Sequence, residues 1–224
     1  LGEENRLVPD AVLSEKLRLA RLIADQAAEV ISRARLSLCL EENEIQTILA
    51  LARVLETHDL YIGSHSRKVT AVAVRLARVL GCAQTEIQMI RWAAMLHDIG
   101  KVGISDKILM KAAKLNPQEW EIVRRHPLNG AEIVRKASNL NYVAALIQAH
   151  HEHFDGSGYP YGLQREMIPF GARILSVADA YAAMTDNRPY QRTFSLNEAL
   201  VELNFCAGTQ FDPRVVEAFT TLFS

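Results

Sequence analysis

Three features of the sequence predict an all-α fold. From Gly63 onward, segments with apolar residues at helical spacing alternate with short breaks at Gly, Pro or Asn. No convincing run of alternating β-branched residues indicates a strand. The 224 residues are 49% hydrophobic and 23% charged, which is enough apolar material to bury a substantial core. We therefore expect one helical bundle domain with a helical extension before it.

The first quarter of the chain predicts a long helix, because it contains neither Gly nor Pro between Asp10 and Ile62. Its apolar residues recur in alternating steps of three and four, and Glu41 is the only break in this heptad pattern. The residues of the pattern are Leu17, Ala20, Ala24, Ala27, Ile31, Ala34, Leu38, Ile45, Ile48, Ala52 and Leu55. We interpret it as a coiled coil that forms a parallel homodimer; the alternative is a long helix packed on its own domain. Residues 1–47 are assigned to a linker and dimerisation segment, and residues 48–224 to the main domain.

The main domain is expected to be a series of helices joined by short breaks. Their predicted ranges are 64–80, 85–98, 117–125, 127–137, 140–151, 171–186, 195–205 and 212–222. The stretch from Glu152 to Phe170 is the main irregular loop. Gly100 is expected to cap the second of these helices, since glycine readily adopts the backbone conformation in which many helices end.

Three histidines of the predicted helices are expected to face the core. His65 continues an apolar stripe that runs on through Val69, and His97 and His150 continue the stripes of their own helices. A single inward histidine is more often a hydrogen-bonded core residue than a metal ligand. Several on converging helices favour a metal site instead.

The residues around these histidines fit the chemistry of such a site. His126 precedes Pro127, so a helix ends there and the ring can reach across a cavity. Imidazoles together with carboxylates suit first-row divalent metals, and the adjacent His97 and Asp98 can serve two ions. Lys101 follows closely, where a phosphate contact is expected.

Composition argues against several other classes of protein. The net charge of -1 shows no excess of basic residues of the kind that binds a nucleic-acid polymer. Three cysteines without C-x-x-C spacing disfavour a disulfide framework and a thiolate zinc site. No apolar run approaches the ~20 residues of a membrane span, and the order of a signal peptide is missing. We expect a cytoplasmic fragment without a membrane segment, taken from a longer protein because it begins at Leu1.

Short motifs along residues 48–224 resemble the HD-GYP domain, a branch of the HD phosphohydrolase superfamily. The motifs are Glu56 and His65, His97-Asp98-Ile99-Gly100-Lys101, His126-Pro127, Gly130-Ala131-Glu132, His150-His151-Glu152, Asp155-Gly156-Ser157-Gly158-Tyr159-Pro160, Ala178-Asp179-Ala180, Arg188-Pro189-Tyr190 and Gly208-Thr209-Gln210-Phe211-Asp212-Pro213. The resemblance implies an HD-type helical bundle. Residues 24–36 resemble the last helix of a GAF sensor domain, which would couple an upstream sensor to the HD-GYP unit through dimer packing.

The resemblance implies a metal-dependent phosphodiesterase. Its reaction would open cyclic di-GMP by metal-hydroxide attack on phosphorus and give linear pGpG, sometimes followed by GMP. Two divalent ions per chain are implied, with iron foremost and manganese as the alternative. Their implied ligands are His65, His97, Asp98, His126, His150, His151 and Asp179. Asp98 would bridge the two ions and act with Lys101 in catalysis.

Other implied residues concern the substrate and the partners. Lys101 and Arg188 match positions that contact the ligand phosphates, and the loop Gly158-Tyr159-Pro160 borders the site and is associated with partner contacts, such as a diguanylate cyclase. Tyr61 stands where some family members have a glutamate that helps to hold a third ion, so two ions are expected. Gln191 stands where a basic residue is often found.

Two alternatives remain open beside the phosphodiesterase. One is a low-activity module that binds cyclic di-GMP or acts as a scaffold through the Gly158-Tyr159-Pro160 loop. The other is a different HD phosphohydrolase that acts on a nucleotide monophosphate or triphosphate. The motif from Asp155 to Pro160 argues against this last reading, because it belongs to the HD-GYP branch.

Overall fold

The computed structural model describes residues 18, 21–22, 25–33, 35, 62–111, 113–137, 140–187 and 192–223. The chain divides into two compact units, residues 1–45 and 46–224. The described residues of the first unit are all helical and exposed, and Arg33 pairs there with Glu29 at 2.7 Å. The long heptad helix and the boundary at residue 47 extend over residues outside this description, so both stay predictions.

The second unit is a helical bundle, as predicted, and no strand occurs among its described residues. Its helices are α2 Ile62–Val79, α3 Gln84–Leu96, α4 Asp106–Leu109, α5 Pro117–Arg124, α6 His126–Ala137, α7 Asn141–Gln148, α8 Phe170–Thr185, α9 Leu196–Phe205 and α10 Pro213–Phe223, with two short 3-10 helices, η1 Ile99–Gly103 and η2 Arg165–Met167. Each predicted helix is confirmed, with its ends shifted by a few residues at most. None of the helices in the described ranges is long and apolar enough to cross a bilayer, and the expected cytoplasmic location stays a prediction.

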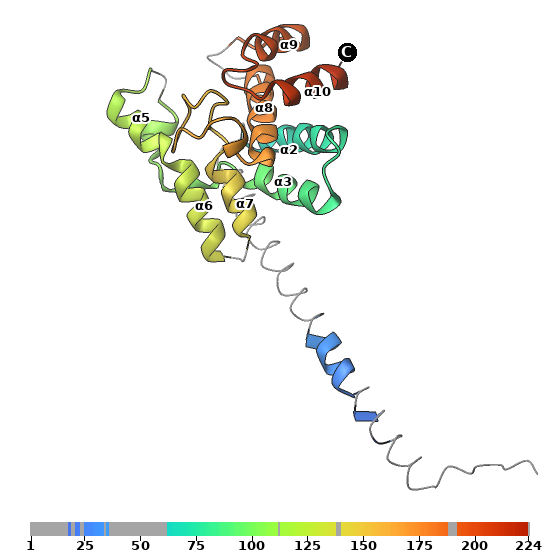
Figure 1. The fold of residues 1–224 in the computed structure, drawn as a ribbon. Helices are drawn as coiled ribbons and strands as arrows, with labels where there is room; N and C mark the ends of the chain where they lie inside the picture. The colour runs from blue at the N-terminus through green and yellow to red at the C-terminus, as the bar shows by residue number, and fades with distance from the viewer. Residues whose placement is uncertain are drawn as a thin grey trace, which may run out of the picture. The chain divides into compact units, whose positions relative to one another are not determined.

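Helix α8 is the centre of the bundle and contacts α2, α3, α7, α9 and α10 (Figure 1). Its buried residues are small or apolar and lie on several sides of the helix: Gly171, Ala172, Ile174, Leu175, Val177, Ala178 and Ala182. A Cβ atom on Gly171 would lie 2.9 Å from side-chain atoms of Ile90 and Leu146, so this glycine lets α3 and α7 pack closely on α8. A polar side chain on so enclosed a helix needs a partner from a neighbouring helix.

Helices α2 and α3 pack on each other and on α8 through the apolar stripes predicted from the sequence. Val69, Ala73 and Leu76 of α2 are fully buried. Ile87 and Ile90 line the buried face of α3. Burial of each large apolar side chain contributes about 1.5–3 kcal/mol, so these stripes fix the rotation of both helices about their axes.

The prediction that Gly100 caps a helix is wrong. Helix α3 already ends at Leu96, with His97 as its C-cap, and Gly100 lies inside η1. A Cβ atom on Gly100 would lie 2.0 Å from the carbonyl oxygen of His126 and 2.5 Å from the backbone nitrogen of Gly130. Glycine is therefore required because the backbones of η1 and α6 nearly touch.

Gly100→Ala is expected to lower the free energy of unfolding by about 1–3 kcal/mol or more, because its methyl group overlaps backbone atoms that cannot turn aside. Gly103→Ala is the matched control in the same 3-10 helix, since nothing lies within 4 Å of the added methyl group. It should change stability by less than about 0.5 kcal/mol. Urea unfolding of both variants measures the difference, and equal stabilities would contradict this account of Gly100.

Candidate metal centre

Three histidines lie at or just after helix ends and are held in the same way, although His126 is also the first residue of α6. His97 is the C-cap of α3, His126 follows α5, and His150 follows α7. Their Nδ1 atoms lie 2.9, 2.7 and 2.6 Å from the carbonyl oxygens three residues earlier, those of Ala94, Val123 and Ile147. A carbonyl oxygen only accepts hydrogen bonds, so each Nδ1 carries a proton and each neutral ring keeps its lone pair on Nε2. The sequence placed His150 inside its helix, but α7 ends earlier, at Gln148.

The Nε2 atoms of these three rings point toward one buried region. Those of His126 and His150 are 3.4 Å apart. Because Nδ1 carries the proton in both neutral rings, two lone pairs face each other across this distance. The Nε2 atom of His97 is buried and has no hydrogen-bond partner. Buried nitrogens with unused lone pairs are costly unless a cation binds between them, so this donor set fits a metal.

Asp98 lies between the histidines and links them into one cluster. Its Oδ1 atom is 3.5 Å from Nε2 of His126, and its Oδ2 atom is 3.4 Å from Nε2 of His97. Lys101 donates to the same Oδ2 at 2.7 Å. Ligand atoms within 4.8 Å of one another form two groups, His65 with His97 and Asp98, and His126 with His150 and His151. A carboxylate with one oxygen toward each group is suited to bridge two ions.

His65 lies between two carboxylates of α8. Its Nε2 atom is 3.0 Å from Oδ1 of Asp179, which is also 3.8 Å from Nε2 of His97. Its Nδ1 atom is 2.7 Å from Oδ2 of Asp186, the C-cap of α8. Burial lowers the pKa of His65, but the hydrogen bond and negative charge of Asp179 outweigh it, so the pKa is raised above 6.5.

The electrostatics of the cluster keep most of its ligands in the form that binds a metal. Burial, reinforced by neighbouring histidines, lowers the pKa of His126, holds that of His150 well below 6.5 and brings that of His151 to about 4. Burial raises the pKa of Asp98, but the charge and hydrogen bond of Lys101 together with the neighbouring His97 and His126 outweigh it, and the pKa falls well below 3.8. These imidazoles are thus neutral and this carboxylate ionised near pH 7, as metal ligation requires.

The loop after His151 is fixed to the cluster through its backbone. Glu152 is buried, and its carboxylate accepts the backbone N–H groups of Tyr161 and Leu163 at 2.7 and 3.0 Å. A Cβ atom on Gly158 would lie 2.5 Å from the carbonyl oxygen of His151, so only glycine permits this close approach. This loop is therefore a rigid border of the site.

Tyr159 lies at the point where this loop meets the cluster. Its ring stacks on His151 with 4.9 Å between the ring centres, and the guanidinium of Arg124 lies over the same ring at 5.3 Å. Burial raises the pKa of its phenol, which therefore stays protonated near pH 7. An aromatic ring held between a candidate ligand and a cation keeps His151 in one orientation.

The structure brings together most of the residues named from the sequence. His65, His97, Asp98, His126, His150, His151, Asp179 and Lys101 form the cluster. The loop after His151 contains Gly158, Tyr159 and Pro160, and the ring of Tyr159 stacks on the ring of His151. Arg188 lies outside the described residues, as do Tyr61 and Gln191.

Sequence reasoning missed two residues around the cluster, Asp186 and Arg124, and assigned no contact to Glu152, which it named only within the motif His150-His151-Glu152. Asp186 had a detectable signal, because it follows Asp179 by seven residues, two helical turns, and directly follows the last residue of α8. Glu152 is part of the motif His150-His151-Glu152, and Arg124 lies two residues before His126, but nothing in their spacing indicates which groups they contact. Only the tertiary structure shows those partners.

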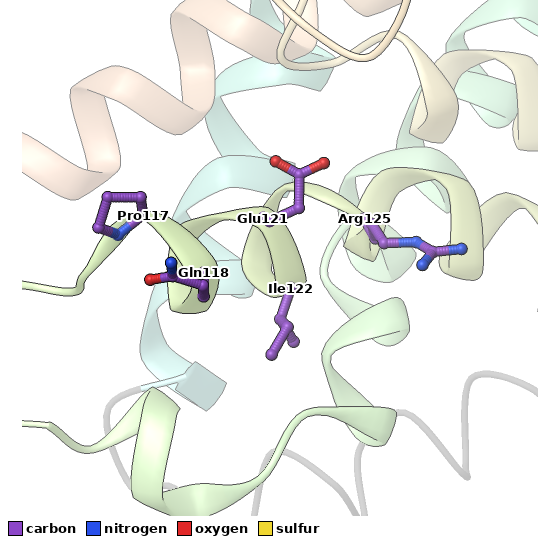
Figure 2. Close-up of a pocket in the computed structure, with 5 residues that line it drawn as sticks. All are labelled: Pro117, Gln118, Glu121, Ile122 and Arg125. Carbon is purple, nitrogen blue, oxygen red and sulfur yellow. The ribbon is translucent and has the colours of Figure 1, made fainter.

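A surface hollow lies on α5. Its lining is made by Pro117, Gln118, Glu121, Ile122 and Arg125, all from α5 or directly after it (Figure 2). None of the clustered histidines or carboxylates lines it. The chemistry of the chain is therefore expected at the buried cluster and not in this hollow.

The lowered pKa values predict that the metal-free protein loses stability in mild acid. The unfolded chain protonates each histidine near pH 6.5 but the folded chain protonates His126, His150 and His151 only at lower pH, so the free energy of unfolding falls as the pH drops below about 6.5. For His151, with a pKa of about 4, the loss reaches ~3 kcal/mol. His65 acts in the opposite direction, since its raised pKa gives stability that is complete below 6.5 and is lost as the pH rises through the folded value.

Urea unfolding of chelator-treated protein between about pH 8 and pH 4 measures this dependence. His151→Asn removes one of the three groups and should give a shallower curve. Identical curves for this variant and the wild type would contradict the assigned protonation of His151.

Comparison with known proteins places the chain in a family. A sequence model described as HD domain matches residues 19–215. A cyclic di-GMP phosphodiesterase response regulator, RpfG of Xanthomonas campestris pv. campestris, is 41% identical over 180 residues, which are 80% of this chain and 48% of that protein. A cyclic di-GMP phosphodiesterase of Thermotoga maritima is 39% identical over 181 residues, with the same coverage of both chains. The chain thus spans about half the length of these curated relatives.

Further relatives differ in substrate or have solved structures. The 3'3'-cGAMP-specific phosphodiesterase 2 of Vibrio cholerae is 39% identical over 180 residues, which are 80% of this chain and 34% of that protein. The crystal structure of a cyclic GMP-AMP specific phosphodiesterase of V. cholerae, V-cGAP3, shares the fold with a TM-score of 0.58 at 22% identity, over 71% of this chain and 43% of that one. Bd1817 of Bdellovibrio bacteriovorus, an HDG"Y"P protein, has a TM-score of 0.58 at 21% identity, over 71% of this chain and 51% of that one.

The match of the family model extends over most of the chain and includes the whole histidine cluster. The relatives matched at 39–41% identity carry the phosphodiesterase names that the sequence motifs led us to expect. The chain therefore belongs to the HD domain family, and its resemblance to the HD-GYP phosphodiesterases is confirmed.

Proposed function

We propose that this chain is a metal-dependent phosphodiesterase that hydrolyses cyclic di-GMP to linear pGpG. The observation that carries the proposal is the convergence of the Nε2 atoms of His97, His126 and His150 in one buried region, with the carboxylate of Asp98 between those of His97 and His126. The names of the two relatives described above as cyclic di-GMP phosphodiesterases support the choice of substrate.

Two divalent ions per chain, with iron foremost and manganese as the alternative, would fit the two groups of ligands. One group is His65, His97, Asp98 and Asp179, and the other is Asp98, His126, His150 and His151. Mixed imidazole and carboxylate donors are suited to both metals. When bound, such ions supply a Lewis acid for the phosphoryl oxygens and lower the pKa of a water molecule.

The protein's own residues would then bind and orient the diester. Lys101 lies 2.7 Å from Asp98, so its ammonium group is held beside the place where a phosphate would meet the cluster. It would stabilise the negative charge that develops on the phosphoryl oxygens. Arg188 is proposed as a second phosphate contact. The Gly158-Tyr159-Pro160 loop is proposed to border the substrate and to offer a surface for a partner such as a diguanylate cyclase.

A second candidate substrate is 3'3'-cGAMP. Among the relatives, the 3'3'-cGAMP-specific phosphodiesterases 2 and 3 of V. cholerae are 39% and 33% identical to this chain. The two dinucleotides differ in one base and share the cyclic phosphodiester backbone, so one metal centre could open either. Discrimination between them must come from groups that contact the bases.

We also propose a homodimer formed through the N-terminal segment. The large apolar residues Leu22, Val30 and Ile31 of this segment are 57%, 67% and 53% exposed in the single chain. Ile31 belongs to the heptad pattern, and a second copy would bury it.

The proposal is tested by incubating cyclic di-GMP with protein purified anaerobically and loaded with Fe(II) or Mn(II), followed by chromatography. Linear pGpG is expected from the wild type. Asp98→Ala should lower turnover by more than about 10³-fold and lose metal at the same time, because one carboxylate would serve both ions. Asp106→Ala, which removes an exposed carboxylate of α4, is the control and should keep full activity.

The outcomes of this assay separate the candidate functions. A parallel incubation with 3'3'-cGAMP shows which dinucleotide is preferred, and a panel of nucleotide monophosphates and triphosphates tests other HD phosphohydrolase activities. Cyclic dinucleotides that bind but stay intact under both metals would overturn the hydrolase and favour a binding or scaffolding module.

Lys101→Gln is expected to lower kcat by about 10²–10³-fold while both ions remain bound, since the ammonium group acts on the charge of the transition state. Metal content and turnover are measured on the same sample. Lys107→Gln changes an exposed lysine of α4 and serves as the control. A variant at residue 101 with wild-type kcat would exclude Lys101 from catalysis.

A further inference from the structure

We infer that Asp186 is a positioning residue of the metal centre: its carboxylate, held by Lys68, keeps His65 protonated on Nδ1 and directs Nε2 toward the proposed ions. The inference rests on the proposed function, because it assigns how one ligand of that site is oriented. The distance from Oδ2 of Asp186 to Nδ1 of His65 is 2.7 Å.

His65 cannot be oriented in the way that the other histidines are. The rings of His97, His126 and His150 each donate to the carbonyl oxygen three residues earlier, in the last turn of a helix, where carbonyl groups lack the partner four residues later. His65 instead lies in the first turn of α2, where the carbonyl oxygens enter the hydrogen bonds of the helix itself. A side chain from another helix must supply the acceptor, and Asp186 does so.

Lys68 fixes the carboxylate in turn. It follows His65 by one turn of α2, and its ammonium group is 3.0 Å from Oδ1 of Asp186. Both oxygens of Asp186 are therefore engaged from the same helix, one by His65 and one by Lys68. The side chain of Asp186 is only 16% exposed, which limits competition from water.

The carboxylates of Asp179 in α8 and of Asp186 at its C-cap contact different nitrogens of the His65 ring. Asp179 lies at Nε2 and also near Nε2 of His97, so it faces the centre of the cluster. Asp186 lies at Nδ1, on the side of the ring away from Asp179. A carboxylate at the second nitrogen of a metal-ligating histidine sets its tautomer and makes the first nitrogen a stronger donor.

Calorimetric titration of chelator-treated protein with Mn(II) tests this role without any substrate. Two ions are expected to bind to the wild type. Asp186→Ala should weaken one of them by about 10–100-fold and leave the other unchanged, because only the group with His65 loses its support. Asp186→Asn retains an acceptor oxygen and should show a smaller loss. With cyclic di-GMP as substrate, an excess of Mn(II) should restore most of kcat, which a merely misfolded variant would not allow.

The tautomer of His65 gives a readout that needs no metal. Nitrogen-15 NMR of the metal-free protein, at a pH where the ring is neutral, should show the proton on Nδ1 in the wild type and a mixture in Asp186→Ala. Lys68→Met should give a smaller change in the same direction, and Asp106→Ala none. If Asp186→Ala keeps both the wild-type tautomer and both wild-type affinities, the inference is overturned. If the wild type binds no ions, the proposed function fails, and the tautomer then tests only whether Asp186 orients the ring of His65.

Discussion

The hydrogen bond from a histidine Nδ1 atom to the carbonyl oxygen three residues earlier is the interaction on which this site depends. His97, His126 and His150 each make it at the end of a different helix. It engages a carbonyl in the last turn of a helix and, in the same contact, fixes the lone pair on Nε2. The C-terminal end of a helix also carries partial negative charge. The C-terminal ends of α3 and α7 therefore favour a cation near the rings of His97 and His150.

The helical bundle supports this arrangement with close backbone contacts. Gly100 lets η1 approach α6, and that approach places Asp98 within 3.5 Å of Nε2 of His126. Gly171 lets α8 pack against α3 and α7, the helices that end near His97 and His150. The same packing buries imidazole nitrogens whose lone pairs accept no hydrogen bond, and this lowers the stability of the metal-free protein. Stability is thus given up at the site where a bound ion would restore it.

The sequence was sufficient for the helices and for the identity of the clustered residues, but not for the contacts between them. Apolar periodicity showed that His65 and His97 face inward, because period and face are local properties. It could not show that Asp186, 121 residues after His65, reaches the same ring, since that contact depends on how α2 and α8 pack. The role of Gly100 was misread for the same reason. Its position after a helix suggested a cap, whereas the constraint comes from the backbone of α6.

The charges of the cluster indicate why a phosphodiester suits this site. Asp98 and Asp179 face its centre as carboxylates, while the charge of Asp186 is balanced by Lys68. Two divalent ions would bring more positive charge than the two facing carboxylates neutralise, and Lys101 adds to the excess. In a buried environment such an excess attracts an anion strongly. A cyclic dinucleotide, the class of substrate proposed above, carries one negative charge on each phosphate and would supply that anion.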